Sequence, residues 1–358
     1  MVTISLCMIV KNEEDTLARC LDCIKDIVDE IIIVDTGSTD HTKEIAKNYT
    51  NLVYDFKWID DFSAARNYSF SKATKDYCLW LDADDIISKE NQEKLKKLKE
   101  TLTIDIDFVM MQYQIAWDEF NNPTFLYYRE RLIRNNKLYL WEGEIHEVIT
   151  TKGKIIYSDI IIIHKKIHKT DPNRNINIFE KLINSGKKLS LRHQFYYARE
   201  LYYHKRYKKA ITYLENFIKN PNAWLENRLD AIRILSFCYN KENLKEKILP
   251  TLLYSLELDI PRAEICCEIG QYFLNKKQYK LAIFWYELAL TRPQESKSGG
   301  FILSDCYGYI PNMQLCVCYY HLGEYNIANE YNEKAGILKP NDNNYKINKK
   351  FFQNLLNI

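Results

Sequence analysis

Three carboxylates that follow a short apolar run are the residues of this 358-residue chain most suited to chemistry. Residues 77–81 have the composition of a buried strand, and Asp82, Asp84 and Asp85 come directly after it. Asp82 and Asp84 stand at alternate positions, so their oxygens can converge on one hard cation such as Mg²⁺ or Mn²⁺. A solvated turn with helix-capping aspartates is the competing interpretation, and the other candidate residues decide between the two.

Two further segments carry side chains that could act in a site. Residues 160–163 are all isoleucine and are followed by His164, a residue type that often binds transition metals. Residues 141–148 read Trp-Glu-Gly-Glu-Ile-His-Glu-Val, which puts His146 beside Glu147. Either side chain can serve as the general base that takes a proton from an attacking nucleophile. The alternative is structural, with a histidine that bonds to a backbone carbonyl and a glutamate that faces water.

These residues belong to an alternation of short apolar runs and helical patterns. The pattern predicts strands at 4–10, 30–35, 52–56 and 77–81, and helices at 15–27, 41–49 and 62–73. This alternation is typical of βαβ units, which form a parallel sheet with right-handed crossovers. Ligands of such sheets bind at the carboxyl ends of the strands, where the acidic residues are expected. Beyond residue 100 the pattern predicts a mixed, partly antiparallel region with strands at 108–115, 125–133 and 137–149.

Residues 3–165 resemble the family 2 nucleotide-sugar glycosyltransferases of the GT-A fold. Four motifs of that family occur in order: IVKNEE at 9–14, IVDTGSTD at 33–40, ARN at 65–67 and LDADD at 81–85. The resemblance implies an α/β fold with a Rossmann-like mixed sheet. It also implies a nucleotide site in which Asp35 and Arg66 contact the base. The nucleotide-binding residues that it implies, with Ser38 either contacting the ligand or capping a helix, are Asn12, Glu13, Asp35, Ser38, Arg66 and Asp82.

For the metal, the resemblance implies that Asp84 holds a divalent cation, Mg²⁺ or Mn²⁺, on the diphosphate, while Asp82 faces the ribose and the metal. Relatives end the corresponding strand with a histidine, so His164 is expected beside Asp84. Relatives also carry an acidic residue within a similar His-Glu pair. This favours Glu147 as the base, with His146 orienting or binding the substrate.

The C-terminal half has the periodicity of helical repeats. Tyr-x-x-Ala occurs at 207–210, 279–282 and 325–328, and each copy precedes a proline. The alanines are 72 residues apart (210 to 282) and then 46 apart (282 to 328). The first interval is close to two tetratricopeptide units of ~34 residues, and the second is one unit with an insertion. We therefore predict a GT-A catalytic domain at 1–172 and an all-α tetratricopeptide-like domain at 173–358, which suits a peptide or protein partner and permits homo-oligomers.

Composition excludes several classes of protein. The chain has 50 basic and 48 acidic residues, so its charge gives no reason to expect a nucleic-acid partner. No apolar run approaches the ~20 residues of a membrane span, and the first strand does not have the flanks of a secretory leader. The ten cysteines lie mainly in apolar contexts, as reduced packing residues do. These features predict a cytoplasmic enzyme without an integral membrane segment.

The predicted reaction is the transfer of a hexose-type sugar from a metal-bound nucleotide-diphosphate sugar, such as a UDP-sugar, with inversion at the anomeric carbon. The order of motifs and repeats is similar to that of bacterial peptide S-glycosyltransferases that modify cysteine in glycocins, which favours a peptide or protein side chain as acceptor. One alternative is a transferase of surface polysaccharide or lipid-linked glycan synthesis. Another is a tetratricopeptide scaffold whose transferase domain binds nucleotide without turnover.

Overall fold

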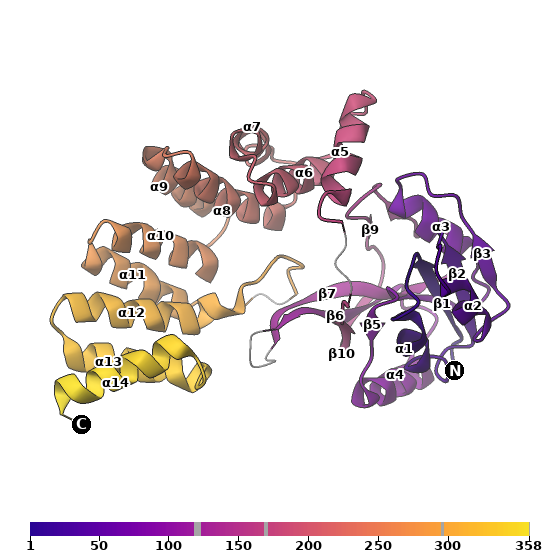
Figure 1. Ribbon diagram of the computed structural model, residues 1–358, viewed down its shortest axis with the longest axis horizontal. Coiled ribbons are helices and arrows are strands. Elements are labelled where there is room, and N and C mark those ends of the chain that lie inside the picture. Colours follow the sequence, from indigo (N-terminus) through magenta and orange to yellow (C-terminus); the bar gives the residue numbers. More distant parts are fainter. Residues whose placement is uncertain (118–122, 168–170, 295–296, 358) are drawn as a thin grey trace. The chain divides into compact units, whose positions relative to one another are not determined.

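The computed structural model describes residues 1–117, 123–167, 171–294 and 297–357, which form two compact units (Figure 1). Unit 1 contains residues 1–115 and 126–193, and unit 2 contains the other described residues. Unit 1 includes helix α5 (Arg174–Asn184), whereas the sequence predicts the change of domain at residues 172 and 173. Phe179 of α5 is fully buried and its ring lies against those of His146 and His193, so this helix packs with the α/β region.

Within the described residues, the main sheet has eight strands in the order β3-β2-β1-β4-β7-β6-β10-β5. The first four are parallel, β7 is antiparallel to β4, β10 is parallel to β6, and β5 is antiparallel to β10. The predicted mixed Rossmann-like sheet is therefore confirmed. The strands are β1 (Ile4–Val10), β2 (Glu30–Asp35), β3 (Val53–Asp55), β4 (Tyr77–Trp80), β5 (Asp85–Ile86), β6 (Phe108–Trp117), β7 (Pro123–Arg134) and β10 (Ile155–His164).

Helices cover both faces of this sheet because its central strands are apolar on both sides. Side chains of α1 (Leu17–Asp22), α2 (Thr42–Lys47) and α4 (Lys89–Thr101) share one core cluster with Ile4, Leu6, Met8 and Val10 of β1. On the other face, Phe70 of α3 (Phe62–Lys72) belongs to a second cluster that contains Cys7, Trp80 and Trp141. The α1 helix is shorter than the predicted 15–27, because the chain after Cys23 continues in tighter turns.

The prediction of one long strand at 137–149 is wrong. Only β8 (Trp141–Glu142) and β9 (Val148–Ile149) are extended, and they pair with each other in a separate two-stranded sheet. Between them, Gly143 has a φ of 98° and His146 has a φ of 52°. Both angles belong to the left-handed region, which a strand cannot contain, so the segment folds into a loop.

Unit 2 is mainly helical, and from α7 onward each helix packs mainly on a helix adjacent to it in the chain. The predicted tetratricopeptide-like repeats are confirmed, and the helix pair of α8 and α9 lacks the Tyr-x-x-Ala signature. The helices are α6 (Leu191–Tyr203), α7 (Tyr207–Phe217), α8 (Leu225–Lys241), α9 (Lys245–Tyr254), α10 (Ala263–Asn275), α11 (Tyr279–Leu290), α12 (Tyr309–His321), α13 (Tyr325–Leu338) and α14 (Asn343–Leu356), with the short 3-10 helices η1 (Ser255–Glu257) and η2 (Ser304–Tyr307).

The turn inside each helix pair repeats with the same geometry. One residue with φ between 58° and 81° precedes the N-cap of the second helix at Lys205, Asn243, Lys277 and Gly323. The next residue donates its N–H to the carbonyl five positions earlier, at 2.8–3.0 Å, as in a Schellman motif. The turns at 243 and 277 are 34 residues apart, which is the tetratricopeptide period.

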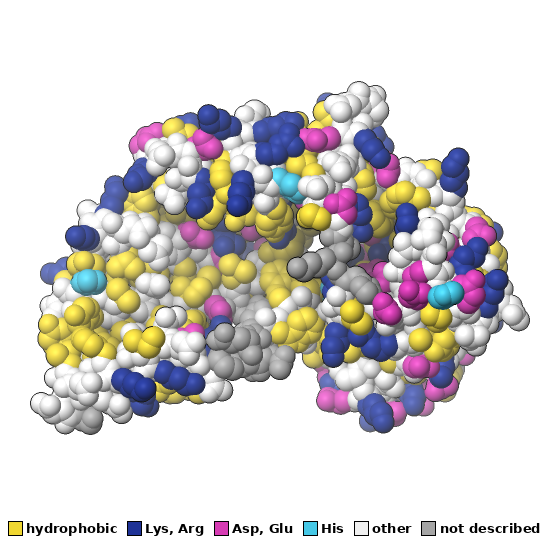
Figure 2. Space-filling view, viewed as in Figure 1, with side chains coloured by type: hydrophobic (Ala, Val, Ile, Leu, Met, Phe, Trp, Pro, Cys, Tyr) yellow, Lys and Arg dark blue, Asp and Glu magenta, His cyan; other side chains and the backbone are white. Residues whose placement is uncertain are grey.

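The surface of this unit also exposes apolar side chains, visible in Figure 2 among lysines and arginines. Phe284 of α11 is 58% exposed and Ile347 of α14 is 65% exposed. None of the helices that the structure describes combines the length and apolar character needed to cross a bilayer.

Each repeat has a small residue seven positions before the turn. The four are Ala198, Ser236, Gly270 and Cys316, and the side chains nine positions after the turn include Leu214, Leu252 and Tyr286, all buried. At Gly270 a β-carbon would lie 2.8 Å from Cζ of Tyr286. Among the four repeats, the third therefore has the smallest residue before the turn, Gly270, and the largest side chain after it, Tyr286.

We predict that Gly270→Ala lowers the free energy of unfolding by about 1–3 kcal/mol, although alanine is the better helix former, because the new methyl group overlaps a buried ring. The double variant Gly270→Ala/Tyr286→Leu reproduces the Ala198 and Leu214 pair of the first repeat and should recover most of the loss. Urea unfolding followed by circular dichroism measures both, with Tyr286→Leu alone as the control. Simple addition of the two single effects would contradict this packing argument.

Candidate active site

The acidic loop after β4 is anchored by its last aspartate. Asp85 is fully buried, and its carboxylate accepts hydrogen bonds from Tyr113 Oη at 2.8 Å and Asp82 N at 3.0 Å. It also pairs with Arg131 Nη1 at 3.1 Å. Arg131 is fully buried as well, and its guanidinium lies 3.7 Å from the centre of the Trp80 ring and 4.0 Å from that of Tyr113. These contacts fix the turn that presents Asp82 and Asp84.

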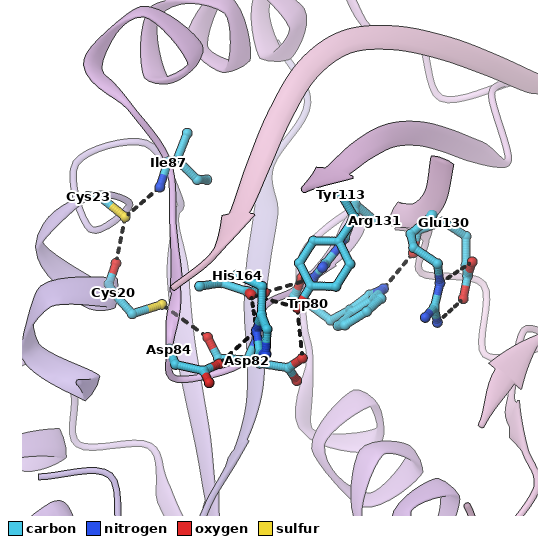
Figure 3. A network of polar contacts seen from close by, with 12 residues as sticks. Cys20, Cys23, Trp80, Asp82, Asp84, Ile87, Tyr113, Glu130, Arg131 and His164 are labelled. Atoms are coloured by element: carbon cyan, nitrogen blue, oxygen red, sulfur yellow. Dashed lines mark hydrogen bonds and ion pairs between the residues drawn. The ribbon is translucent and has the colours of Figure 1, made fainter. Parts of the chain in front are cut away.

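His164 lies beside this loop because β10 pairs with β5, in the register His164 to Asp85. Figure 3 shows its imidazole between the aspartates. Nδ1 is 3.1 Å from Asp84 Oδ1 and 3.2 Å from Asp85 Oδ1. Burial lowers the pKa of His164, but the hydrogen bonds to Asp84 and Asp85 outweigh it and raise the pKa to about 10. A metal at this imidazole would therefore have to displace a proton.

The side chains at this point suit a divalent cation. Ligand atoms of Asp82, Asp85 and His164 lie within 4.8 Å of one another. The sequence predicts Asp82, Asp84 and His164 as ligands, and Asp85 is the member of the group that it missed. Asp85 is already bound by Arg131, Tyr113 and a backbone amide. The Asp84 side chain is 14% exposed, and its Oδ1 pairs with His164 Nδ1. Carboxylate oxygens with one imidazole fit Mn²⁺ or Mg²⁺.

Arg66 of α3 connects the acidic loop to the segment that follows β8. Its Nη2 donates to Asp82 Oδ1 at 2.8 Å, and its Nε donates to Glu147 Oε1 at 2.7 Å. The guanidinium also lies 4.8 Å from the ring centre of Trp80 and 4.9 Å from that of Trp141. Burial raises the pKa of Asp82, but the positive charges of Arg66 and Arg131 lower it well below its usual value. The buried guanidinium of Arg66 thus joins Asp82, a predicted metal ligand, to Glu147, the predicted general base.

Asn67, the next residue of the helix, holds the backbone of the same segment. Its Nδ2 donates to Trp141 O at 2.9 Å, and its Oδ1 accepts from Trp141 N at 2.8 Å. A side-chain amide that pairs both ways with a peptide group fixes the position and direction of that strand. The Ala-Arg-Asn motif therefore places Glu147 through a side chain and Trp141 through its backbone.

His146 and Glu147 lie in different surroundings although they are neighbours in sequence. The His146 ring stacks on Phe179, with 6.2 Å between ring centres, and its carbonyl accepts from Arg192 Nε. Glu147 instead belongs to the Arg66 network. Of the two residues that the sequence proposed as bases, the structure brings Glu147 next to the acidic loop and does not bring His146 there.

Four of the predicted nucleotide residues, Asn12, Glu13, Asp35 and Ser38, lie at the carboxyl ends of β1 and β2, which pair in the register Val10 to Asp35. The other two, Arg66 and Asp82, pair with each other at the acidic loop. Asp35 is 2% exposed, and its Oδ1 accepts from the N–H groups of Gly37 and Ser38 at 3.0 Å each. Its Oδ2 has no hydrogen-bond partner among the described residues. A buried acceptor without a hydrogen-bond partner is uncommon, and an N–H group of the nucleobase would satisfy this one.

The loops that flank Asp35 hold each other. Asn12 N donates to Ser38 Oγ at 2.9 Å, and Asn12 Oδ1 accepts from Thr39 N at 2.8 Å. Ser38 therefore does not cap α2, whose N-cap residue is His41. Glu13 Oε2 accepts from Thr16 Oγ1 at 2.6 Å, which ties Glu13 to the start of α1. Asn12 and Ser38 are brought together, and Glu13 supports the loop that carries them.

The α1 helix packs under the acidic loop. Arg19 Nη2 donates to Lys165 O at 2.9 Å and Asp84 O at 3.4 Å, and Cys20 Sγ lies 3.4 Å from Asp82 O. Cys23 Sγ accepts from Ile87 N at 3.4 Å (Figure 3). Burial raises the pKa of both thiols, which fits packing cysteines. Arg19 and Arg131 could not be identified from the sequence, because each contacts a partner distant in the chain.

Comparisons with known proteins agree with this architecture. Residues 5–169 match the family model described as glycosyl transferase family 2. The chain is 30% identical over 286 residues to the SPbeta prophage-derived glycosyltransferase SunS of Bacillus subtilis (strain 168), a match that covers 75% of this chain and 65% of the relative. It is 47% identical over 96 residues to a TPR repeat-containing protein of Synechococcus elongatus, over 27% of this chain and 24% of that protein.

The chain thus spans less than two thirds of the length of these curated relatives. Among solved structures, it is similar to the glucosyl-3-phosphoglycerate synthase of Mycobacterium tuberculosis in complex with Mn²⁺ and UDP-glucose, at 26% identity over 32% of this chain and 44% of that one. The TM-score of that comparison is 0.28. Residues 5–169 thus match glycosyl transferase family 2, and tetratricopeptide-like helices follow them in the same chain.

Proposed function

We propose that this protein is a metal-dependent inverting glycosyltransferase that moves a hexose-type sugar from a nucleotide-diphosphate sugar, with UDP-sugars as the donor class, to a peptide or protein side chain. The observation that carries the proposal is the Arg66 bridge, since it ties Asp82 on the metal side to Glu147 on the base side at 2.8 and 2.7 Å. A displacement at an anomeric carbon needs both groups, on opposite sides of the sugar.

Each part of the site has a separate task in this proposal. The unpartnered Oδ2 of Asp35 accepts a hydrogen bond from an N–H of the nucleobase, and Asn12 and Ser38 hold the loop beside the nucleoside. Asp84, Asp82 and His164 would hold Mg²⁺ or Mn²⁺, which would supply positive charge to stabilise the departing diphosphate. Glu147 takes the proton of the acceptor group as that group attacks the anomeric carbon. The bond that forms joins the acceptor to the sugar, and the bond that breaks joins the sugar to the diphosphate.

A cysteine thiol is the acceptor group that asks least of this base. A free thiol has a pKa near ~8.5, far below that of an alcohol, so little proton transfer is needed in the transition state. The 30% identity with a glycosyltransferase supports transferase chemistry. The helical repeats support a polypeptide partner.

The direct test is turnover of UDP-glucose, UDP-N-acetylglucosamine and GDP-mannose by the full chain with and without Mn²⁺, followed by mass spectrometry of cysteine and serine test peptides. Metal-dependent hydrolysis of a UDP-sugar supports the enzyme. Added hexose mass on the cysteine peptide supports the acceptor class. Hydrolysis without any modified peptide would favour a glycan acceptor, and binding without hydrolysis would favour a scaffold.

We predict that Glu147→Gln lowers sugar transfer by about 10²–10⁴-fold, the range for loss of a general base, with little change in donor affinity. The amide oxygen can still accept from Arg66, so the network should persist. Glu142→Gln, an exposed position of the same segment, is the matched control. Full transfer by Glu147→Gln together with a large loss in His146→Asn would reassign the base to His146.

Metal binding should depend on Asp84. We predict that EDTA abolishes donor hydrolysis, that Mn²⁺ restores it, and that Asp84→Asn weakens Mn²⁺ binding in the presence of UDP by about tenfold or more, since it removes a charged ligand. Electron paramagnetic resonance of free Mn²⁺ measures this without relying on turnover. The exposed Asp26→Asn is the control. Unchanged, EDTA-resistant hydrolysis by Asp84→Asn would rule out the metal role.

Asp85 should differ from Asp84 in its effect on stability. Removing one partner of a buried ion pair costs about 3–5 kcal/mol, so Asp85→Asn should lower the free energy of unfolding by that order because Arg131 loses its counter-charge. Asp84→Asn should change it by about 1 kcal/mol or less. Chemical denaturation measures both. Equal stability of the two variants would mean that Asp85 is a ligand and not an anchor.

A further inference from the structure

Residues 143–147, which include both side chains considered as the base, are held by a part of unit 1 that follows the matched transferase sequence. We call residues 143–147 the base loop. The residues that contact it belong to 187–193, which follow α5 and include the first turn of α6. The family match ends at residue 169, so these contacts come from beyond it. We call residues 187–193 the bracing segment.

The base loop needs support because its backbone is left-handed at two positions. Gly143 has a φ of 98° and His146 has a φ of 52°. Glycine adopts such angles freely, whereas a residue with a β-carbon keeps them only where surrounding contacts hold it. The next residue after His146 is Glu147, whose Oε1 lies 2.7 Å from Arg66 Nε. The conformation at His146 therefore sets the direction in which the chain brings Glu147 to Arg66.

Arg192 of the bracing segment holds this left-handed residue by its backbone. Arg192 Nε donates to His146 O at 2.9 Å, and the His146 ring stacks on Phe179 of α5, with 6.2 Å between ring centres. A charged donor makes a stronger hydrogen bond to a carbonyl than a neutral donor does. The carbonyl of residue 146 belongs to the peptide group that joins it to residue 147. Arg192 thus acts on the peptide bond directly before the proposed base.

The start of the base loop is held by two other side chains of the bracing segment. His193 is 5% exposed, and a β-carbon on Gly143 would lie 2.9 Å from its Nε2, so the imidazole packs directly on the loop backbone. Lys187 Nζ pairs with Glu144 Oε1, and His193 Nδ1 lies 3.6 Å from Glu144 Oε2. Glu144 O also accepts from Phe62 N at 2.9 Å. The loop is thus fixed between the start of α3 and the bracing segment.

We propose that Arg192, His193 and Lys187 are positioning residues for sugar transfer, which keep the base loop in the conformation that brings Glu147 to Arg66. The role of Glu147 as general base is the one point that rests on the proposed function. A displacement of a reacting group by about 1 Å can cost as much as ~10²-fold in rate, although the group itself is intact. The bracing segment therefore acts on the rate through Glu147 and not through the substrate.

The kinetic test uses Arg192→Ala in the full-length chain. We expect kcat for transfer to fall by about 10–10²-fold while KM for the donor stays unchanged, since the donor residues are untouched. Arg192→Lys keeps a charged donor and should recover part of the loss. In the Glu147→Gln background, Arg192→Ala should cause no further loss of kcat, whereas a merely structural role would lower it again. Lys188→Ala, an exposed position of the bracing segment, is the matched control.

Hydrogen exchange followed by mass spectrometry tests the same positioning without any turnover. The amides of the base loop should exchange faster in Arg192→Ala than in Lys188→Ala, while those of β1 keep their protection. Lys187→Ala removes a side chain that is 53% exposed and takes the place of Arg192→Ala if that variant does not fold.

A folded variant of Arg192 or Lys187 with unchanged loop exchange would overturn the proposal, and so would an active one with unchanged kcat. Equal losses from Arg192→Ala with and without Glu147→Gln would do the same. If the unchanged protein turns over no donor, the proposed function fails, whereas the exchange measurement still decides whether the bracing segment positions the loop.

Discussion

The buried ion pair between Asp85 and Arg131 is the interaction on which the arrangement of the acidic residues depends. Both side chains are fully buried, and the guanidinium lies between two aromatic rings. Because one Asp85 carboxylate also binds the Asp82 amide and Tyr113 and lies next to His164, it fixes the loop after β4 and the end of β10 together. An apolar residue at 85 could be buried as well, but it would leave buried Arg131 without its counter-charge and Tyr113 and the Asp82 amide without their acceptor.

Helix α3 carries this order over to the other side of the site. Arg66 and Asn67 are adjacent, yet one reaches two carboxylates and the other a peptide group of β8. The charge of Arg66 offsets those of Asp82 and Glu147, which allows two acids to approach in a poorly hydrated place. Arg66 and Asn67 of α3 therefore position Asp82 on the predicted donor side relative to Glu147 and Trp141 on the predicted acceptor side.

Much of this could be predicted from the sequence, and the failures have physical causes. The strands at 4–10 and 30–35 are continuous apolar runs, and the polar motifs follow their ends, so the edge of the sheet could be located. The prediction for 137–149 was wrong because alternating apolar residues do not reveal the left-handed backbone at Gly143 and His146. Arg131 could not be found, since a charged residue in a strand pattern shows nothing of the carboxylate opposite it. Glu147 was identified from its motif, but its ion pair with Arg66 joins residues far apart in the chain.

The left-handed residues of the repeat turns bear on the thermal stability of the helical unit. Three of the four left-handed turn positions are occupied by lysine or asparagine, and only the last is glycine. A side chain in that conformation costs roughly 1 kcal/mol relative to glycine, least for asparagine. The helical unit therefore tolerates small, repeated backbone penalties, and the lysines at 205 and 277 mark where thermal resistance could be raised by engineering without touching any residue near the sugar chemistry.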